Sequence, residues 1–268
     1  MELSITKIKA FKSCRRMYQL RYIEGLKPVQ KAEALEIGSN YHALIEGLNN
    51  TGCLPDAEDN WSKELAMATA YQKYIYPHFK VVAAEQKVEL DLWNDDKLIG
   101  YVDGIAEDGY IVEHKTTGSE ITEEYEYNLL WDEQILAYML MTGARKVHYT
   151  VCRKPTIRQK QSESAKEFFN RMVAWYDEDT DSKIRLLEIE RMDSEVAEFE
   201  KNLHNMLRIM KEAERNDADI YRNTCHCNQY GRRCEYSSIC LHYDPNQEYI
   251  EFVKGERNNG VEENSTEF

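Results

Sequence analysis

Two carboxylates and a lysine fall close together in the segment Asp103-Gly-Ile-Ala-Glu-Asp-Gly-Tyr-Ile-Val-Glu-His-Lys115. An Asp-Gly pair between two apolar runs is a strong signal for a β-hairpin. If the loop has three residues and Gly109 supplies the positive φ, Asp103 lies opposite Glu113, on the face that carries Lys115. A two-residue loop would instead set Asp103 opposite His114 and separate the three groups. The longer loop predicts a divalent-cation site for phosphodiester hydrolysis.

This chemistry needs oxygen ligands and a positive charge beside an anionic phosphate. Carboxylates bind hard cations, which orient the phosphate and lower the pKa of an attacking water. Asp103 and Glu113 supply such ligands. We interpret Lys115 as an electrostatic stabiliser, because acting as a base would need a large fall from its usual pKa of about 10.4. The alternative interpretation is a surface hairpin with an ordinary Glu–Lys pair.

Two further features flank the hairpin. Gln134 and Tyr138 are four residues apart, so a helix would place both on one face. Upstream, His42 follows Gly38 by about one helical turn. A single helical histidine is more often structural than a ligand. As a neutral imidazole, however, it could complete a site that prefers manganese to magnesium.

Taken in order, these residues form a recognisable pattern. His42, Glu85, Asp103, Glu113-x-Lys115 and Gln134-x-x-x-Tyr138 together resemble the PD-(D/E)XK nuclease superfamily. The resemblance is to its RecB-like exonuclease branch with an iron–sulfur cluster, of the CRISPR-associated and phage-encoded type. The segment 4–22 belongs to the same pattern, and Val102 replaces the proline that gives the superfamily its name.

The resemblance implies specific roles. His42, Asp103, Glu113 and the backbone carbonyl of His114 would bind Mn²⁺ or Mg²⁺. Lys115 would be catalytic, with Gln134 and Tyr138 supporting the site and contacting DNA. Glu85 matches the acidic position on the preceding strand less closely. Whether one or two ions act is left open.

Seven cysteines point to metal or redox chemistry before disulfides. Four of them crowd into 225–240, but the two close Cys-x-x-Cys pairs of a zinc ribbon are absent. The resemblance implies a 4Fe-4S cluster held by Cys14, Cys227, Cys234 and Cys240. Zinc on the same thiolates and Cys225 in place of Cys227 are the alternatives. Cys53 and Cys152 are interpreted as small buried apolar residues.

Composition limits the partners. The net charge is −14, but eight Lys or Arg residues against two Glu occupy 1–31, and a second basic cluster occupies 145–171. Either could follow a phosphate backbone. The sequence has neither a long apolar span nor the pattern of a signal peptide, so we expect no membrane partner and a cytoplasmic location in a bacterial or phage-infected cell.

Periodicity predicts helices over 4–22, 32–48, 59–76, 128–142, 162–179 and 192–215, and strands over 81–93, 98–106, 110–115 and 146–152. The expected class is α/β, restriction-endonuclease-like, with a central mixed sheet flanked by helices. We expect a metal cluster to join the N-terminal helical region to the C-terminal cysteine-rich region. One nuclease domain would span 1–250, with a helical region over 1–80, a catalytic core over 81–180 and the cluster region over 181–243. An acidic disordered tail would follow over 251–268.

The predicted function is a metal-dependent DNA exonuclease that acts on single-stranded or unwound ends. The resemblance implies 5′→3′ polarity and a place in recombination, repair or spacer acquisition. A non-catalytic DNA-end-binding adaptor, a structure-specific endonuclease and an RNA nuclease are the alternatives. Because the sequence lacks a Walker loop, we expect a helicase or recombination protein as a partner.

Overall fold

The computed structural model describes residues 1–30, 33–56, 61–216, 220–229 and 232–255. The chain folds into two compact units, each assembled from segments that are separate in sequence. Unit 1 contains Met1–Lys31, Glu89–Gly100 and Ala197–Glu262. Unit 2 contains Ala32–Val88, Tyr101–Val196 and Glu263–Phe268. The single domain over 1–250 stays a prediction, and the two units are described in turn.

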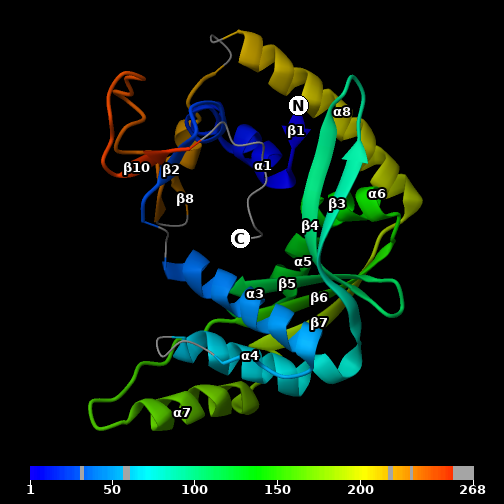
Figure 1. The fold of residues 1–268 in the computed structure, drawn as a ribbon, viewed down its shortest axis with the longest axis vertical. Helices are drawn as coiled ribbons and strands as arrows, with labels where there is room; N and C mark the ends of the chain where they lie inside the picture. Colours follow the sequence, from blue (N-terminus) through cyan, green and yellow to red (C-terminus); the bar gives the residue numbers. More distant parts are fainter. Residues whose placement is uncertain (31–32, 57–60, 217–219, 230–231, 256–268) are drawn as a thin grey trace. The chain divides into compact units, whose positions relative to one another are not determined.

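Unit 2 is built around a mixed sheet (Figure 1). Strand β5 pairs in parallel with β6, whereas β4 with β5 and β6 with β7 are antiparallel. Strand β3 pairs with β4 beside this path. The strands are β3 (Val81–Asp91), β4 (Lys97–Ala106), β5 (Ile111–Thr117), β6 (Lys146–Arg153) and β7 (Ile184–Glu190). The end of β3 and the start of β4 belong to unit 1. The mixed sheet of the predicted α/β class is confirmed.

Helices cover both faces of this sheet. The helices are α3 (Glu33–Thr51), α4 (Ser62–Tyr74), α5 (Glu123–Leu129), α6 (Glu133–Thr142) and α7 (Ala165–Glu178). One apolar cluster joins α3, α4 and α7 to Cys152 and Ile184. A second joins α5 and α6 to Val147, Tyr149 and Val151. Val147, Tyr149 and Val151 of β6 thus belong to one cluster and Cys152 to the other, because successive strand side chains point to opposite faces. In Figure 1, α4 is accordingly drawn below the strands β5, β6 and β7, and α5 and α6 above them.

The predicted hairpin joins β4 to β5. Gly104 pairs with Val112 and Ile105 with Ile111, which leaves Glu107, Asp108 and Gly109 as the loop. Gly109 has φ +83°, the left-handed conformation that glycine adopts without strain. The three-residue loop and its register are therefore confirmed.

Two predicted helices are interrupted. The helix expected over 128–142 is split into α5 and α6, because the side chain of Asp132 accepts from the backbone N–H of Gln134 and begins α6 there. The helix expected over 4–22 is α1 (Ile5–Ser13), α2 (Arg15–Tyr18) and a π-helical turn (Gln19–Ile23). Cys14, at φ −160°, separates the first two.

Unit 1 joins both ends of the described chain. Its remaining elements are β1 (Glu2–Leu3), β2 (Leu26–Pro28), α8 (Asp193–Arg215, which begins in unit 2), β8 (Asn228–Gln229), β9 (Arg232–Arg233) and β10 (Phe252–Lys254). Strand β10 pairs with β2, and the Tyr236 hydroxyl donates to the carbonyl of Leu26 at 2.8 Å. The predicted tail therefore begins later than residue 251, and 256–268 lie outside the described residues.

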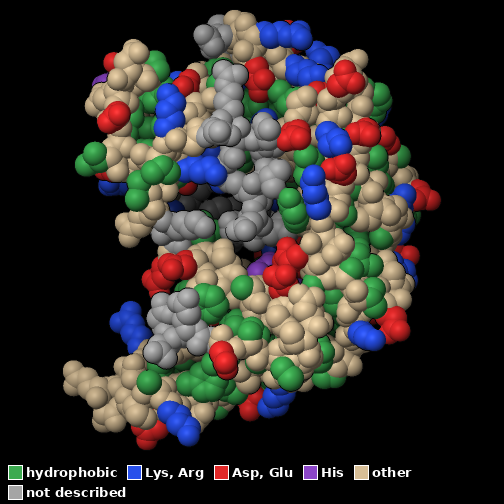
Figure 2. All heavy atoms as spheres, in the orientation of Figure 1, with side chains coloured by type: hydrophobic (Ala, Val, Ile, Leu, Met, Phe, Trp, Pro, Cys, Tyr) green, Lys and Arg blue, Asp and Glu red, His purple; other side chains and the backbone are tan. Residues whose placement is uncertain are grey.

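Surface charge is mixed. On the face drawn in Figure 2, lysine and arginine side chains are interspersed with aspartate and glutamate. Among the described residues, no helix has both the length and the apolar character to cross a membrane.

Candidate metal-dependent active site

The Glu-His-Lys segment of β5 divides its side chains between the two faces of the sheet. Glu113 and Lys115 follow Ile111 at alternate positions, and Ile111 belongs to the apolar cluster of α5 and α6. His114 points the other way, and its ring lies 5.2 Å from that of Tyr71 in α4. All three are buried, so this central strand carries ionisable groups where apolar ones are usual.

Asp103 turns toward α3. Its Oδ1 lies 3.2 Å from Nδ1 of His42, and its Oδ2 accepts a hydrogen bond of 2.5 Å from the backbone N–H of His114. Val102 and Ile105 both contact the α5–α6 cluster, so the strict alternation of β4 is broken between them. Asp103 therefore reaches the site from the α3 side, and not from the face of Glu113 as a flat ladder would require.

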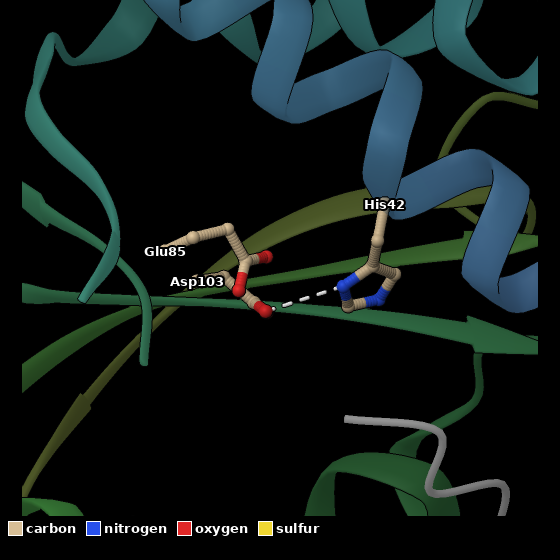
Figure 3. Close-up of side chains that lie close together, drawn as sticks. All are labelled: His42, Glu85 and Asp103. Atoms are coloured by element: carbon tan, nitrogen blue, oxygen red, sulfur yellow. Dashed lines mark hydrogen bonds and ion pairs between the residues drawn. The ribbon is translucent and has the colours of Figure 1, made fainter. Parts of the chain in front are cut away.

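Glu85 of β3 completes a compact group with these residues. One ligand atom each from His42, Glu85 and Asp103 lie within 4.8 Å of one another. Figure 3 shows the imidazole pointing from α3 toward the Asp103 carboxylate, with Glu85 alongside. Ions that bind at about 2.0–2.1 Å can bridge oxygen atoms up to roughly 4.2 Å apart, so a small contraction would close the group on a cation.

Glu85 has an unusual backbone. Its φ is +46°, a conformation that residues other than glycine rarely adopt. Such outliers within a strand concentrate at functional sites, where the surrounding structure enforces them. The sequence alone carried no signal for this turn of the backbone.

Glu113 and Lys115 form a buried ion pair with 2.5 Å between Oε1 and Nζ. Glu113 Oε2 accepts no hydrogen bond from the described residues, although it is fully enclosed. A buried oxygen in this state is costly unless a cation or a proton binds it. It is therefore the feature outside the compact group that best fits a bound metal.

The charges of the site shift several pKa values. Burial, and then the nearby Asp103 charge, raise the pKa of Glu113 to about 8 against the effect of Lys115. Burial would likewise raise the pKa of Asp103, but His42, His114 and Lys115 outweigh it and hold that pKa well below its usual value. Asp103 thus stays ionised at neutral pH, whereas Glu113 ionises against the cost of burial, which the adjacent Lys115 ammonium or a bound cation would offset.

The three basic groups respond differently. Burial would lower the pKa of Lys115, but Glu113, Asp132 and Asp103 together raise it, which agrees with a charged stabilising role. Burial would lower the pKa of His42, but Asp103 raises it overall. Burial lowers the pKa of His114 to about 4, so this imidazole is neutral and its Nδ1 lies 2.7 Å from Thr150 Oγ1.

Gln134 and Tyr138 share one face of α6, as predicted. Lys115 Nζ donates to Gln134 Oε1 at 3.1 Å, and Gln134 Nε2 donates to the Tyr138 hydroxyl at 2.8 Å. The sequence interpretation missed Asp132, whose Oδ1 accepts from the N–H of Gln134 at 3.0 Å. An Asp two residues before Gln134 is a helix-cap signal, and this signal could have identified Asp132.

The cysteines of unit 1 gather around a separate pocket. Cys14, Cys227, Cys234 and Cys240 all line it, together with His226 and Asn223. Asn223 donates its N–H to Cys14 Sγ at 3.3 Å, and Cys227 Sγ lies 3.9 Å from the Asn223 carbonyl. Cys225 is exposed and is not among the described residues that line the pocket.

The four sulfur atoms do not form a compact metal site. Within the described part of the chain, no three of them lie within 4.8 Å of one another. A tetrahedral zinc with Zn–S bonds of about 2.3 Å needs sulfur atoms roughly 3.8 Å apart. Cys14, Cys227, Cys234 and Cys240 thus line one pocket, and the 4Fe-4S cluster stays a prediction. The interpretation of Cys53 as a buried residue is wrong, since its side chain is exposed, whereas Cys152 is buried as expected.

Comparison with known proteins identifies a family. A model of the PD-(D/E)XK nuclease superfamily matches residues 2–73 and 59–241. No curated protein matches the chain. A crystal structure from Eubacterium rectale, described as a "Putative exonuclease", has a TM-score of 0.54 at 15% identity and covers 93% of this chain and 90% of its own. This likeness shows a shared fold.

Two other solved structures are more distant. An alkaline exonuclease from Laribacter hongkongensis matches at 14% identity and a TM-score of 0.36, over 81% of this chain and 93% of its own. A phage-related exonuclease from Haemophilus somnus 129PT matches at 14% identity and a TM-score of 0.34, over 70% and 87% respectively.

Proposed function

Because this chain belongs to the PD-(D/E)XK nuclease superfamily, we propose that it is a divalent-metal-dependent deoxyribonuclease that degrades DNA from single-stranded or unwound ends. The observation that carries the proposal is the compact group of His42, Glu85 and Asp103 beside the buried Glu113–Lys115 pair. An ordinary surface hairpin would have no reason to bury these charges together.

The proposed metal ligands are His42, Asp103, Glu113 and the backbone carbonyl of His114, with Glu85 as an additional carboxylate. A bound Mn²⁺ or Mg²⁺ would neutralise the scissile phosphate and lower the pKa of the attacking water. The imidazole nitrogen of His42 favours Mn²⁺ over Mg²⁺, which prefers oxygen ligands.

The remaining residues act on the substrate and on one another. The Lys115 ammonium stabilises negative charge that develops on the phosphate oxygens. Gln134 holds Lys115 through its Oε1, and Tyr138 fixes the opposite end of the same amide. Catalysis would therefore depend on α6 as well as on the hairpin.

We further propose that the pocket of unit 1 holds a 4Fe-4S cluster. Cysteine thiolates are the usual ligands of such clusters, and four cysteines line this one pocket. The N–H of Asn223 on Cys14 Sγ is the kind of hydrogen bond that tunes cluster sulfurs.

Metal analysis after anaerobic purification tests the cluster. We expect iron and sulfide in the parent and in Cys225→Ser, and their loss in Cys14→Ser. A colourless protein that contains zinc and no iron would refute the cluster. Loss of iron in Cys225→Ser would identify Cys225, instead of Cys227, as the fourth ligand.

Substrate comparison tests the activity. The protein is incubated with Mn²⁺ and with linear single-stranded DNA, linear duplex, closed circular DNA or RNA, each labelled. We expect cleavage of linear single strands, with the 5′-labelled end released first if the polarity is 5′→3′. Cleavage of circles would instead identify an endonuclease, and binding without cleavage would identify an end-binding adaptor. Duplex ends would need a separate helicase or recombination protein to open them.

A further inference from the structure

The turn between α5 and α6 displays apolar side chains to solvent. Tyr127, Leu130 and Trp131 are 55%, 49% and 70% exposed. Three large apolar residues within five positions form an unusual surface for a helix end. We call this group the α5 patch.

The exposure of the α5 patch is fixed by its backbone. The N–H groups of Leu130, Trp131 and Asp132 donate to carbonyls three residues earlier, at 3.1, 3.1 and 3.2 Å. Buried Arg191 donates from Nη2 to the carbonyl of Leu129 at 2.8 Å, and the Leu129 side chain is buried. Leu129 is anchored inward, and the next two residues, Leu130 and Trp131, lie outward on this hydrogen-bonded turn.

The α5 patch is close in sequence to residues of the proposed active site. Trp131 directly precedes Asp132, which accepts the hydrogen bond from Gln134 N–H that begins α6. Gln134 in turn binds Lys115. The exposed indole is thus adjacent in sequence to the chain of contacts that reaches Lys115.

The chemistry of the α5 patch suits bases better than phosphates. Exposed Glu123 and Glu124 lie on the same short helix and would repel a phosphate backbone. Aromatic rings, however, stack on any base through its π face, whatever the sequence. The rings of Tyr127 and Trp131 lie 6.3 Å apart at 71°, so the pair offers two differently oriented surfaces.

We propose that Tyr127 and Trp131 are a stacking platform for unpaired bases of the DNA strand whose backbone enters the active site. This inference rests on the proposed nuclease function and names its substrate class, a strand with exposed bases. The platform would position the strand next to the scissile phosphate and would favour single strands over intact duplex.

The test measures binding to the full-length protein in EDTA, so that no cleavage occurs. The probes are fluorescein-labelled oligothymidylate and an abasic oligonucleotide of the same length. Trp131→Ala is expected to weaken oligothymidylate binding about 5- to 150-fold, the range of one lost stacking contact. Abasic binding should stay unchanged, and Trp131→Phe should recover most of the affinity.

The control is Ile250→Ala, which removes another highly exposed apolar side chain, in unit 1, and should change neither affinity. Equal affinity of Trp131→Ala and the parent for oligothymidylate would overturn the platform, and the patch would then be assigned to a protein partner. Equal losses on both probes would overturn it as well. Because the assay needs no catalysis, a base-selective loss in a protein without nuclease activity would support the platform and refute only the proposed function.

Discussion

The backbone N–H of His114 donates a hydrogen bond of 2.5 Å to Oδ2 of Asp103. The middle residue of the Glu-His-Lys segment thereby holds the carboxylate of the neighbouring strand, while its own ring packs toward α3 and α4. The bond fixes one Asp103 oxygen and leaves Oδ1 directed at His42. Both strands of the hairpin must keep their separation for the site to exist.

Gly104 lets β4 approach the neighbouring strand β3 closely. A Cβ at this position would lie 2.8 Å from Val81 Cγ1 and 3.2 Å from the Ala83 carbonyl. Gly104→Ala should therefore destabilise the protein by about 1–3 kcal/mol, which lowers the melting temperature by roughly 2–4 °C per kcal/mol. Gly118→Ala is the control, since nothing lies within 4 Å of its Cβ. Equal melting temperatures of the two variants, by calorimetry, would contradict this packing.

Glu85 should contribute directly to metal binding. Glu85→Gln keeps the size of the side chain but removes the charge from the group with His42 and Asp103. We expect the Mn²⁺ affinity, measured by isothermal titration calorimetry, to fall at least about tenfold. Glu107→Gln alters an exposed acid in the adjacent hairpin loop and should bind as the parent does. If both variants bind alike, Glu85 is not a ligand.

Metal affinity should rise with pH. The pKa of Glu113 is raised to about 8, chiefly by burial and then by Asp103, so below that pH a cation must displace the proton. Affinity for Mn²⁺ should increase about tenfold per pH unit from 6 to 8 through Glu113 and level off above, and the proton that His42 must release would steepen the rise. In Glu113→Gln the increase should become shallower. A parent protein with constant affinity over this range would show that Glu113 binds no metal.

Asp132 should stabilise the helix that carries Gln134 and Tyr138. Removing the cap in Asp132→Ala is expected to cost about 1 kcal/mol of unfolding free energy. Asp132→Asn retains an oxygen that accepts from Gln134 N–H and should cost much less. Urea denaturation measures both variants. Equal losses would mean that the charge of Asp132, and not its cap, stabilises the protein.

Much of the β4–β5 hairpin could be predicted because local rules determine it. Gly109 at positive φ sets the loop length, which sets the register of Asp103 against β5. The helical spacing of Gln134 and Tyr138 was likewise sufficient to place both on one face of α6.

The departures depend on partners distant in sequence. The helical segment at Cys14 is broken where Asn223 binds Cys14 Sγ and, through its Nδ2, the carbonyl of Ser13 at 2.8 Å. Local propensity contains no trace of that contact. The same holds for the positive φ of Glu85 and for Asp103 turning toward His42, since both are imposed by neighbouring elements.

We propose that the buried Glu113–Lys115 pair beside Asp103 takes part in metal-dependent DNA hydrolysis. The most direct test is the rate at which the parent, Glu113→Gln and Glu107→Gln degrade linear single-stranded DNA in Mn²⁺. We predict cleavage by the parent and by Glu107→Gln, and a loss of at least about 100-fold in Glu113→Gln at an unchanged melting profile. A folded Glu113→Gln variant that degrades DNA at the parental rate would contradict the proposed role of Glu113.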